Sequence, residues 1–112
     1  MSAPKTGTNA PKPSTRPRTV RIIGKTYRIR YLTGKPLEED DLGEFDPAKQ
    51  SITIRRGQPL EQEQDTLLHE CLHAISSELD LSLTEKQVRP LATTWLGMLK
   101  DNPAFIAYLR RK

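Results

Sequence analysis

The apolar residues of this chain change from an alternating to a helical spacing near residue 60. Before that point, β-branched and partly alternating runs occupy residues 19–23 and 26–32, with Gly24-Lys25 between them. Two such runs separated by a pair that contains glycine are typical of a β-hairpin. The first part of the domain is therefore expected to begin with a hairpin.

A second pair of strands is predicted at residues 43–46 and 51–55. The turn between them has Pro47 at its second position, which is the favoured place for proline. Gly57 and Pro59 then end the sheet. The sequence thus predicts a small antiparallel sheet made of two hairpins.

A helix is predicted from about Leu60 to Leu79, where apolar residues recur at intervals of three and four. Acidic residues in its first turn suit the positive end of the helix dipole. The expected core stripe of this helix consists of Leu67, Leu68, Leu72, Ile75 and Leu79.

A second helix is predicted from Glu85 to about Leu99, because Thr84 is a good N-cap and Gln87 stands at the capping-box position. Asn102-Pro103 then opens a short third helix that continues through Leu109. The expected fold class is α+β, with the small antiparallel sheet followed by two to three helices.

The N-terminal segment, residues 1–19, contains four prolines and almost no apolar side chain. Such a segment cannot bury enough surface to offset the entropy of ordering. We therefore predict a disordered basic tail over residues 1–19 and one folded domain over residues 20–112. The sequence shows no apolar run typical of a signal peptide or a transmembrane helix, so no membrane association is expected.

Basic residues gather near the N-terminus, which the net charge of +4 conceals. Residues 1–37 carry nine basic side chains and no acidic one, whereas residues 38–112 carry nine basic and all fourteen acidic side chains. A flexible basic tail can bind nucleic acid through counterion release, but it can equally aid solubility or dock on its own domain. The acidic run at residues 38–41 is predicted to be a solvated loop rather than a cation site.

The first predicted helix contains the sequence His69-Glu70-Cys71-Leu72-His73, which holds both histidines of the chain. Positions i and i+4 share one helical face, so both imidazoles can reach one Zn²⁺ while Glu70 points at a water on that metal. With Leu68 at the centre of the apolar stripe, the histidines lie about 100–140° away, at its edge. The opposing interpretation is an ordinary core helix that binds no metal.

Two histidines leave a catalytic zinc site incomplete, because such a site has three protein ligands and one open position. Glu78 turns to the opposite side of the helix, and Asp80 would lie about 10 Å beyond His73 along the axis. Glu85 is preferred because it opens the next helix after a short break, so an antiparallel return can bring its carboxylate back. Its alternative role is that of a favourable acid in a first helical turn.

Cys71 is the single cysteine, so no internal disulfide can form and a reducing cytoplasm is the expected compartment. This residue is predicted to be a small apolar side chain on the buried side of the helix. A role as the missing metal ligand is the alternative.

This order of elements resembles the small zincin-like metallopeptidases of phages and prophages, which are similar to the ImmA/IrrE metallopeptidase group. The resemblance covers about residues 20–110, and its sharpest part is the motif within residues 66–75. It implies a minimal zincin-like domain in which His69, His73 and Glu85 bind Zn²⁺ and Glu70 is the base. The connection between His73 and Glu85 is shorter than in larger members of that group, and an extra sensor domain like theirs is not expected in this sequence.

The resulting prediction is a zinc-dependent metallopeptidase that hydrolyses a peptide or protein substrate in the cytoplasm, or in the host cytoplasm if a phage encodes it. Glu70 is the expected general base and a zinc-bound water the nucleophile. An outer strand of the hairpin could pair with an extended substrate. The candidates for stabilising the oxyanion are Tyr27, Tyr31, Tyr108 and Arg89.

Two alternatives stay open at the level of the sequence. One is a catalytically silent, zinc-stabilised phage regulatory or nucleic-acid-binding module whose basic tail contacts the nucleic acid. The other is a structural interaction domain that binds no metal. Metal content distinguishes the metal-free structural domain from the zinc peptidase and the silent module. Hydrolysis by a Glu70 variant distinguishes the peptidase from the silent module.

Overall fold

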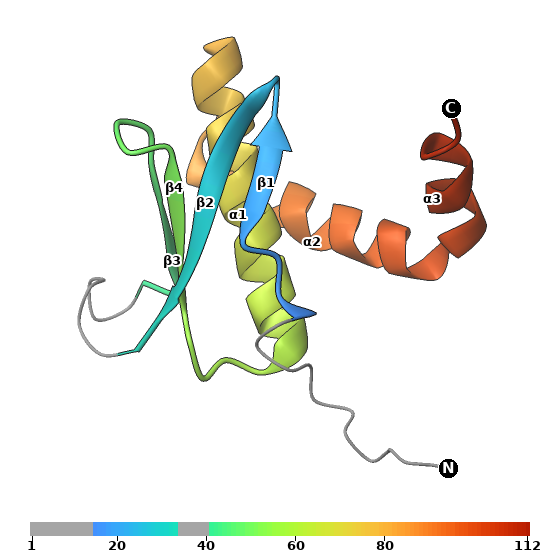
Figure 1. The fold of residues 1–112 in the computed structure, drawn as a ribbon, viewed down its shortest axis with the longest axis horizontal. Coiled ribbons are helices and arrows are strands. Elements are labelled where there is room, and N and C mark those ends of the chain that lie inside the picture. The colour runs from blue at the N-terminus through green and yellow to red at the C-terminus, as the bar shows by residue number, and fades with distance from the viewer. Residues whose placement is uncertain (1–14, 34–40) are drawn as a thin grey trace.

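The computed structural model describes residues 15–33 and 41–112, which form an α+β fold of one sheet and three helices (Figure 1). The strands are β1 (Thr19–Ile22), β2 (Lys25–Leu32), β3 (Gly43–Asp46) and β4 (Ser51–Arg55). The helices are α1 (Leu60–Leu79), α2 (Glu85–Asp101) and α3 (Pro103–Leu109). Within the described ranges, no helix is both long and apolar enough to span a membrane.

The sheet is mixed, with the strand order β1-β2-β4-β3. Both predicted hairpins are present, but β2 and β4 pair in parallel, so the prediction of an all-antiparallel sheet is wrong. The physical reason lies in β4, which is buried along Ser51–Ile54 and needs a neighbour on each side. In β3 the only large apolar residue is Phe45, and this strand suits the exposed edge.

The turn of the first hairpin lies one residue earlier than predicted. Ile23 and Gly24 have φ values of 50° and 76°, and a two-residue turn of type I′ requires a positive φ at both positions. The strands then pair from Ile22 opposite Lys25. This register directs Tyr27 and Ile29 of β2 toward α1.

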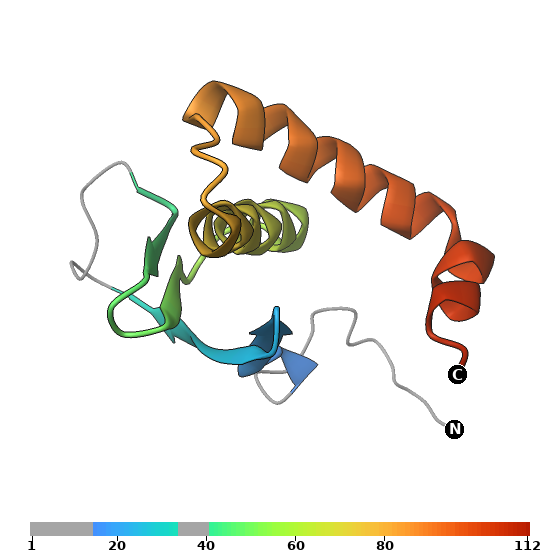
Figure 2. The same ribbon diagram turned by 90° about the horizontal axis from the view of Figure 1, so that it is seen from above.

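Helix α1 lies between the sheet and α2, so the molecule has three layers (Figure 2). Leu67 and Cys71 pack against the core of the sheet, whereas Leu68 and Leu72 pack against α2. The single core stripe expected from the sequence is therefore two stripes on two sides of the helix. Leu79, which was expected in the core, is half exposed at the end of α1.

The domain begins earlier than the predicted boundary at residue 20. Arg16 Nε donates a hydrogen bond of 2.8 Å to Glu63 Oε2, and the Tyr31 hydroxyl donates one of 2.8 Å to the carbonyl of Pro17. Thr19 already belongs to β1. The predicted tail is thus too long at its C-terminal end, while its residues 1–14 lie outside the described residues, as do residues 38–40 of the predicted acidic loop.

Candidate metal centre

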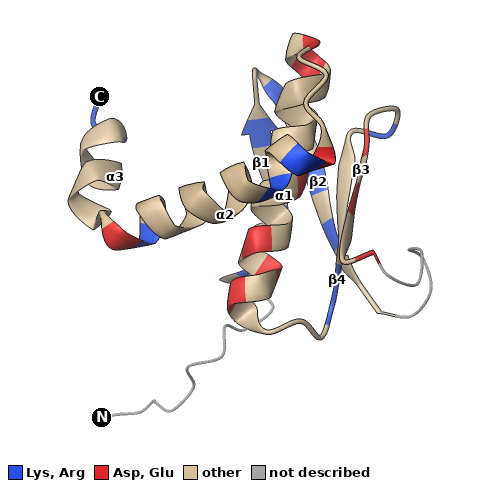
Figure 3. Cartoon of the chain, turned by 180° about the vertical axis from the view of Figure 1, so that it is seen from behind, with Lys and Arg blue, Asp and Glu red and all other residues tan. Residues whose placement is uncertain are grey.

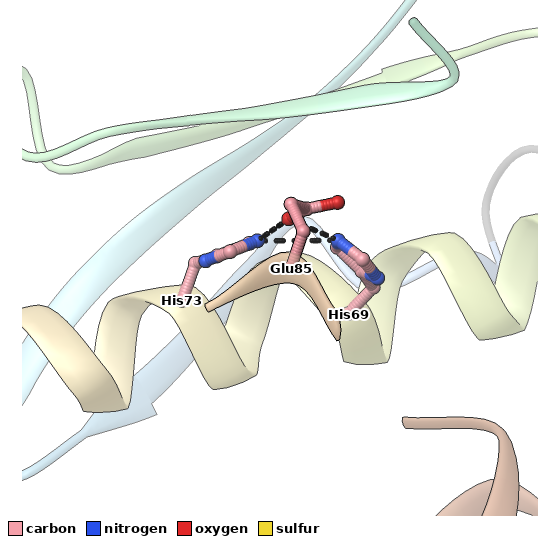
Figure 4. A group of neighbouring side chains, drawn as sticks. All are labelled: His69, His73 and Glu85. Carbon is pink, nitrogen blue, oxygen red and sulfur yellow. Dashed lines mark hydrogen bonds and ion pairs between the residues drawn. The ribbon is translucent and has the colours of Figure 1, made fainter. Parts of the chain in front are cut away.

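His69 and His73 lie one turn apart on α1, and Glu85 approaches them from the first turn of α2 (Figure 4). The Nε2 atoms of the two imidazoles are 3.2 Å apart, and Glu85 Oε1 lies 3.0 Å from His69 Nε2. The same carboxylate oxygen contacts His73 Nε2 still more closely. The structure therefore brings the three predicted ligands together at one point.

The distances from His69 Nε2 to His73 Nε2 and to Glu85 Oε1, 3.2 and 3.0 Å, suit a tetrahedral metal ion. With bonds of about 2.0–2.1 Å, two ligand atoms of a tetrahedral zinc site are about 3.3 Å apart. The lone pairs of two imidazoles and a carboxylate repel one another unless a proton or a cation lies between them. Two histidines and one glutamate form a donor set that catalytic zinc sites use, with a fourth position left open. The residues present therefore fit Zn²⁺.

The position of Glu85 is determined by the turn that joins α1 to α2. Asp80 ends α1 in the left-handed conformation, and its backbone N–H donates to carbonyls of the last turn. Ser76 Oγ then accepts a hydrogen bond of 2.9 Å from the Leu83 N–H. Thr84 and Gln87 form the capping box predicted from the sequence, which starts α2 directly at Glu85. The turn thus delivers a first-turn carboxylate to the face of α1 that carries the histidines.

Neighbouring groups stabilise the ionised form of Glu85 at both of its carboxylate oxygens. Partial burial disfavours the ionised form, but the hydrogen bonds with His69 and His73 outweigh it, and the net effect lowers the pKa of Glu85. Its second oxygen, Oε2, lies 3.6 Å from Arg89 Nη2, one turn further along α2. Arg89 can therefore hold the carboxylate in the orientation that points Oε1 at the imidazoles.

Glu70 is buried beside the triad, with 7% of its surface exposed. Burial is the main cause that raises the pKa of its carboxyl group to about 7, and the negative charges of Glu85, Asp41 and Glu44 add to the effect. A cation held by the triad would oppose this shift, because a nearby positive charge favours the carboxylate.

Gly43 allows β3 to approach α1 closely at Glu70. A Cβ atom at this position would lie 2.6 Å from Thr66 Cγ2 and 3.3 Å from Glu70 Oε2, so any side chain there would push the strand or the carboxylate aside. This requirement was not among the sequence-based predictions. A glycine at the start of a predicted strand was the available signal.

An open groove of about 700 Å³ runs between β3 and the metal centre. Its walls include Gly43 and Phe45 of β3, the histidines and Glu70 of α1, and Glu85 of α2. The N–H of Arg55 donates to the carbonyl of Leu42, so the alternation of an antiparallel ladder directs the backbone groups of Gly43 and Phe45 away from β4. Among the described residues no strand pairs with this edge of β3, which borders the groove.

The other predicted candidates lie in different places. Asp80 lines the groove but is outside the triad, and Cys71 packs against the sheet core, where burial raises the pKa of its thiol to about 11. Of the four oxyanion candidates, only Arg89 lies next to the triad. The hydroxyl of Tyr27 donates to Glu78, that of Tyr31 donates to the carbonyl of Pro17, and Tyr108 is exposed on α3.

No family model, curated protein or solved structure matches this chain.

Proposed function

We propose that this protein is a zinc-dependent peptidase whose metal ligands are His69, His73 and Glu85 and whose general base is Glu70. One observation carries the proposal. The carboxylate of Glu85, 16 residues beyond His69 in the sequence, lies 3.0 Å from His69 Nε2. It also contacts His73, whose ring packs edge-on against that of His69 one helical turn away. The resemblance of the motif to zincin-like metallopeptidases supports the same assignment.

When bound, the zinc ion would polarise a substrate carbonyl and lower the pKa of a water molecule. Glu70 follows His69 in the chain and lines the same groove, so its carboxylate can accept a proton from the attacking water. The oxygen of that water then bonds to the carbonyl carbon, and the carbonyl oxygen takes up negative charge. Glu70 gives the proton to the amide nitrogen as the C–N bond breaks, which yields a carboxylic acid and an amine.

The edge of β3 indicates which class of substrate the groove could bind. An extended peptide that pairs with the backbone groups of Gly43 and Phe45 would lie in the groove, across from Glu70 and the histidines. Backbone pairing does not depend on side chains, so an unfolded or flexible polypeptide segment is the expected substrate. Arg89 borders an adjoining hollow of the same centre and can donate hydrogen bonds to the developing oxyanion.

The decisive experiment compares the full chain, purified without a histidine tag, with its Glu70→Gln variant. Both proteins should contain about one Zn²⁺ per chain, because the substitution leaves the three ligands in place. The variant should lose at least about 100-fold in the cleavage of a library of unfolded proteins and peptides. Glu61→Gln, at an exposed position in the first turn of α1, is the matched control and should cleave like the wild type.

Two results would contradict the proposal. Equal cleavage by the wild type and by Glu70→Gln would exclude Glu70 as the base. A zinc-loaded wild type that cleaves none of these substrates would favour the catalytically silent module instead. The ligand assignment has its own check: His69→Ala and Glu85→Gln should lower the zinc content, while Asp80→Asn should leave it unchanged.

A further inference from the structure

The outer face of the sheet, which points away from α1, is rich in basic side chains. Tyr27 and Ile29 of β2 are buried toward the helix, so the alternating residues Arg28 and Arg30 point to the opposite face, where both are exposed. In the described part of the chain all three helices lie elsewhere and leave this face open (Figure 2).

A hollow of about 530 Å³ lies on this surface and is lined by Thr19, Arg28, Arg30 and Lys49 among others. We call this surface the basic sheet face and define it by these four residues. A second hollow of about 420 Å³ adjoins it at Thr19 and Arg28, but its lining also includes Ile29 and Tyr31 of the inner face. Neither hollow is lined by an acidic residue among those described.

Much of the negative charge gathers on the other side of the domain, where the groove at the candidate metal centre is lined by Asp41, Glu44, Asp80 and Glu85. On the sheet itself, Glu44 and Asp46 of β3 are in register with Arg30 and Arg28 across β4, so they border the basic sheet face at the far edge of the sheet. In Figure 3 acidic residues mark α1 and β3, whereas basic residues mark β1, β2 and the end of β4. Among the described residues, no carboxylate forms an ion pair with Arg28 or Arg30. Within the described part of the chain, the donors of these guanidinium groups therefore face an external anion rather than a carboxylate partner.

The chemistry of the face favours repeated phosphate groups. Arginine offers two parallel N–H donors that match two oxygens of a phosphate, and an exposed threonine hydroxyl such as that of Thr19 can add a further contact. The ring of Tyr31, at the border of the face, is covered by Arg16, whose guanidinium carbon lies 6.0 Å from its centroid. Stacking on unpaired bases is thereby disfavoured, and contact with a duplex backbone is favoured.

A lipid surface fits this face less well. The large apolar side chains that are exposed in the described residues include Leu42, Leu60 and Trp95, and none of them lines either hollow. A membrane-binding surface would need such residues to insert between the lipid headgroups.

We propose that the basic sheet face binds the phosphate backbone of a nucleic acid duplex without sequence preference. This binding uses the face of the sheet opposite to the metal centre and does not depend on zinc or on the proposed peptidase activity. It also differs from binding through the segment at residues 1–14, which carries Lys5 and Lys12.

The test measures the binding of the full chain to a short fluorescent DNA duplex of arbitrary sequence over a range of salt concentrations. Arg28→Glu combined with Arg30→Glu should weaken binding at least about 10-fold at low salt, since two phosphate contacts are lost and two like charges are introduced. The slope of log affinity against log salt should also decrease in magnitude by about 2. Binding of the wild type should be the same with zinc and with a chelator.

Two control pairs change the net charge by the same amount. Lys5→Glu with Lys12→Glu tests the N-terminal segment, and Lys86→Glu with Lys100→Glu on α2 tests net charge alone. Both pairs should weaken binding less than the sheet pair does. Equal losses for the sheet and α2 pairs, or a larger loss for the N-terminal pair, would overturn the proposal.

Folding and partner class are controlled separately. The sheet pair should retain the thermal midpoint of the wild type. If the two glutamates disturb folding, the variant Arg28→Gln with Arg30→Gln takes their place and should also weaken binding. Poly-glutamate or anionic phosphatidylglycerol vesicles should compete weakly with the duplex. Equal competition by either would overturn the assignment to nucleic acid.

Discussion

The two sides of α1 are built differently, and the candidate metal centre is associated with the side whose core cluster contains fewer buried residues. Toward the sheet, α1 covers Ile52 and Ile54, which are fully buried. Toward α2, the buried contact consists of Leu72, Val88 and Ala92. Beyond that contact α2 continues away from the domain, and large apolar side chains such as Trp95 are about half exposed (Figure 1).

This difference separates the scaffold of the site from its adjustable part. His69, His73 and Glu70 are carried by the helix that the sheet holds, whereas Glu85 is carried by the first turn of α2. We expect the position of Glu85 to depend on the turn before it and on the metal ion that it would share with the histidines. The following predictions test this contrast, from the largest expected effect to the smallest.

Ile52→Ala should lower the free energy of unfolding by about 2–5 kcal/mol, because it leaves a cavity in a fully buried strand. Leu72→Ala removes a side chain of the same size on the α2 side and should cost less, since α2 can move into the space. Urea unfolding at equilibrium measures both changes. A larger loss for Leu72→Ala would reverse the contrast.

Removing zinc should lower the free energy of unfolding by about 2.7 kcal/mol relative to a solution in which free zinc is 100 times its dissociation constant. Removing zinc should also speed amide hydrogen exchange in residues 80–88, while exchange in β2 and β4 stays slow. The His69→Ala variant, which loses a ligand, should show no response to zinc. Uniform loss of protection over the whole domain would contradict a separate adjustable part.

Tyr27→Phe should lower the free energy of unfolding by about 1.5–3 kcal/mol, because the hydroxyl of this buried residue donates a hydrogen bond of 2.6 Å to the Glu78 carboxylate. Burial and this bond raise the pKa of Tyr27 from 10.0 to about 12. From neutral pH up to about pH 10 the stabilisation is complete in the wild type, because Tyr27 is neutral and Glu78 is ionised. Between pH 10 and 12 the unfolded chain ionises first, so the stability falls.

The pH dependence therefore gives a second measurement of the sheet side. Tyr27→Phe should make the decline in stability above pH 10 less steep, while Tyr108→Phe, at a position that is 67% exposed, should leave it as in the wild type. Thermal or urea unfolding over this pH range provides the comparison. The same slope in wild type and Tyr27→Phe would show that another group is responsible.

Ser76→Ala should weaken zinc binding about 5-fold, which corresponds to the loss of about 1 kcal/mol for one hydrogen bond. The Ser76 hydroxyl accepts the N–H of Leu83 and thereby holds the turn that presents Glu85. Ser77→Ala, at the exposed neighbouring position, is the matched control. Competition with a zinc chelator measures the affinity, and no difference between the two variants would exclude this role for the turn.

Much of the secondary structure followed from local patterns. The bounds of α1 and α3 agree with the spacing of apolar residues and with Pro103, and the capping box of Thr84 and Gln87 starts α2 at the predicted residue. These features depend on residues within one or two turns of each other. The sequence is sufficient for them because no distant contact is needed.

The arrangement of the sheet followed less well. The alternation in residues 43–46 and 51–55 predicted a hairpin, but it did not indicate that β4 of this hairpin would pair with β2. Placing β4 in the centre depends on how much surface its neighbours bury in the folded state. The need for glycine at position 43 likewise arises only when β3 meets Thr66 and Glu70 of α1.

The sequence by itself determined the helical spacing of His69 and His73, the carboxylate next to the first of them, and the cap that begins α2. Only the tertiary structure decided that Glu85 meets both imidazoles, that an edge strand borders their groove, and that the arginines of β2 share one open face. The reason is that a spacing within one helix is local, whereas these contacts join separate elements whose packing depends on the burial of the whole domain.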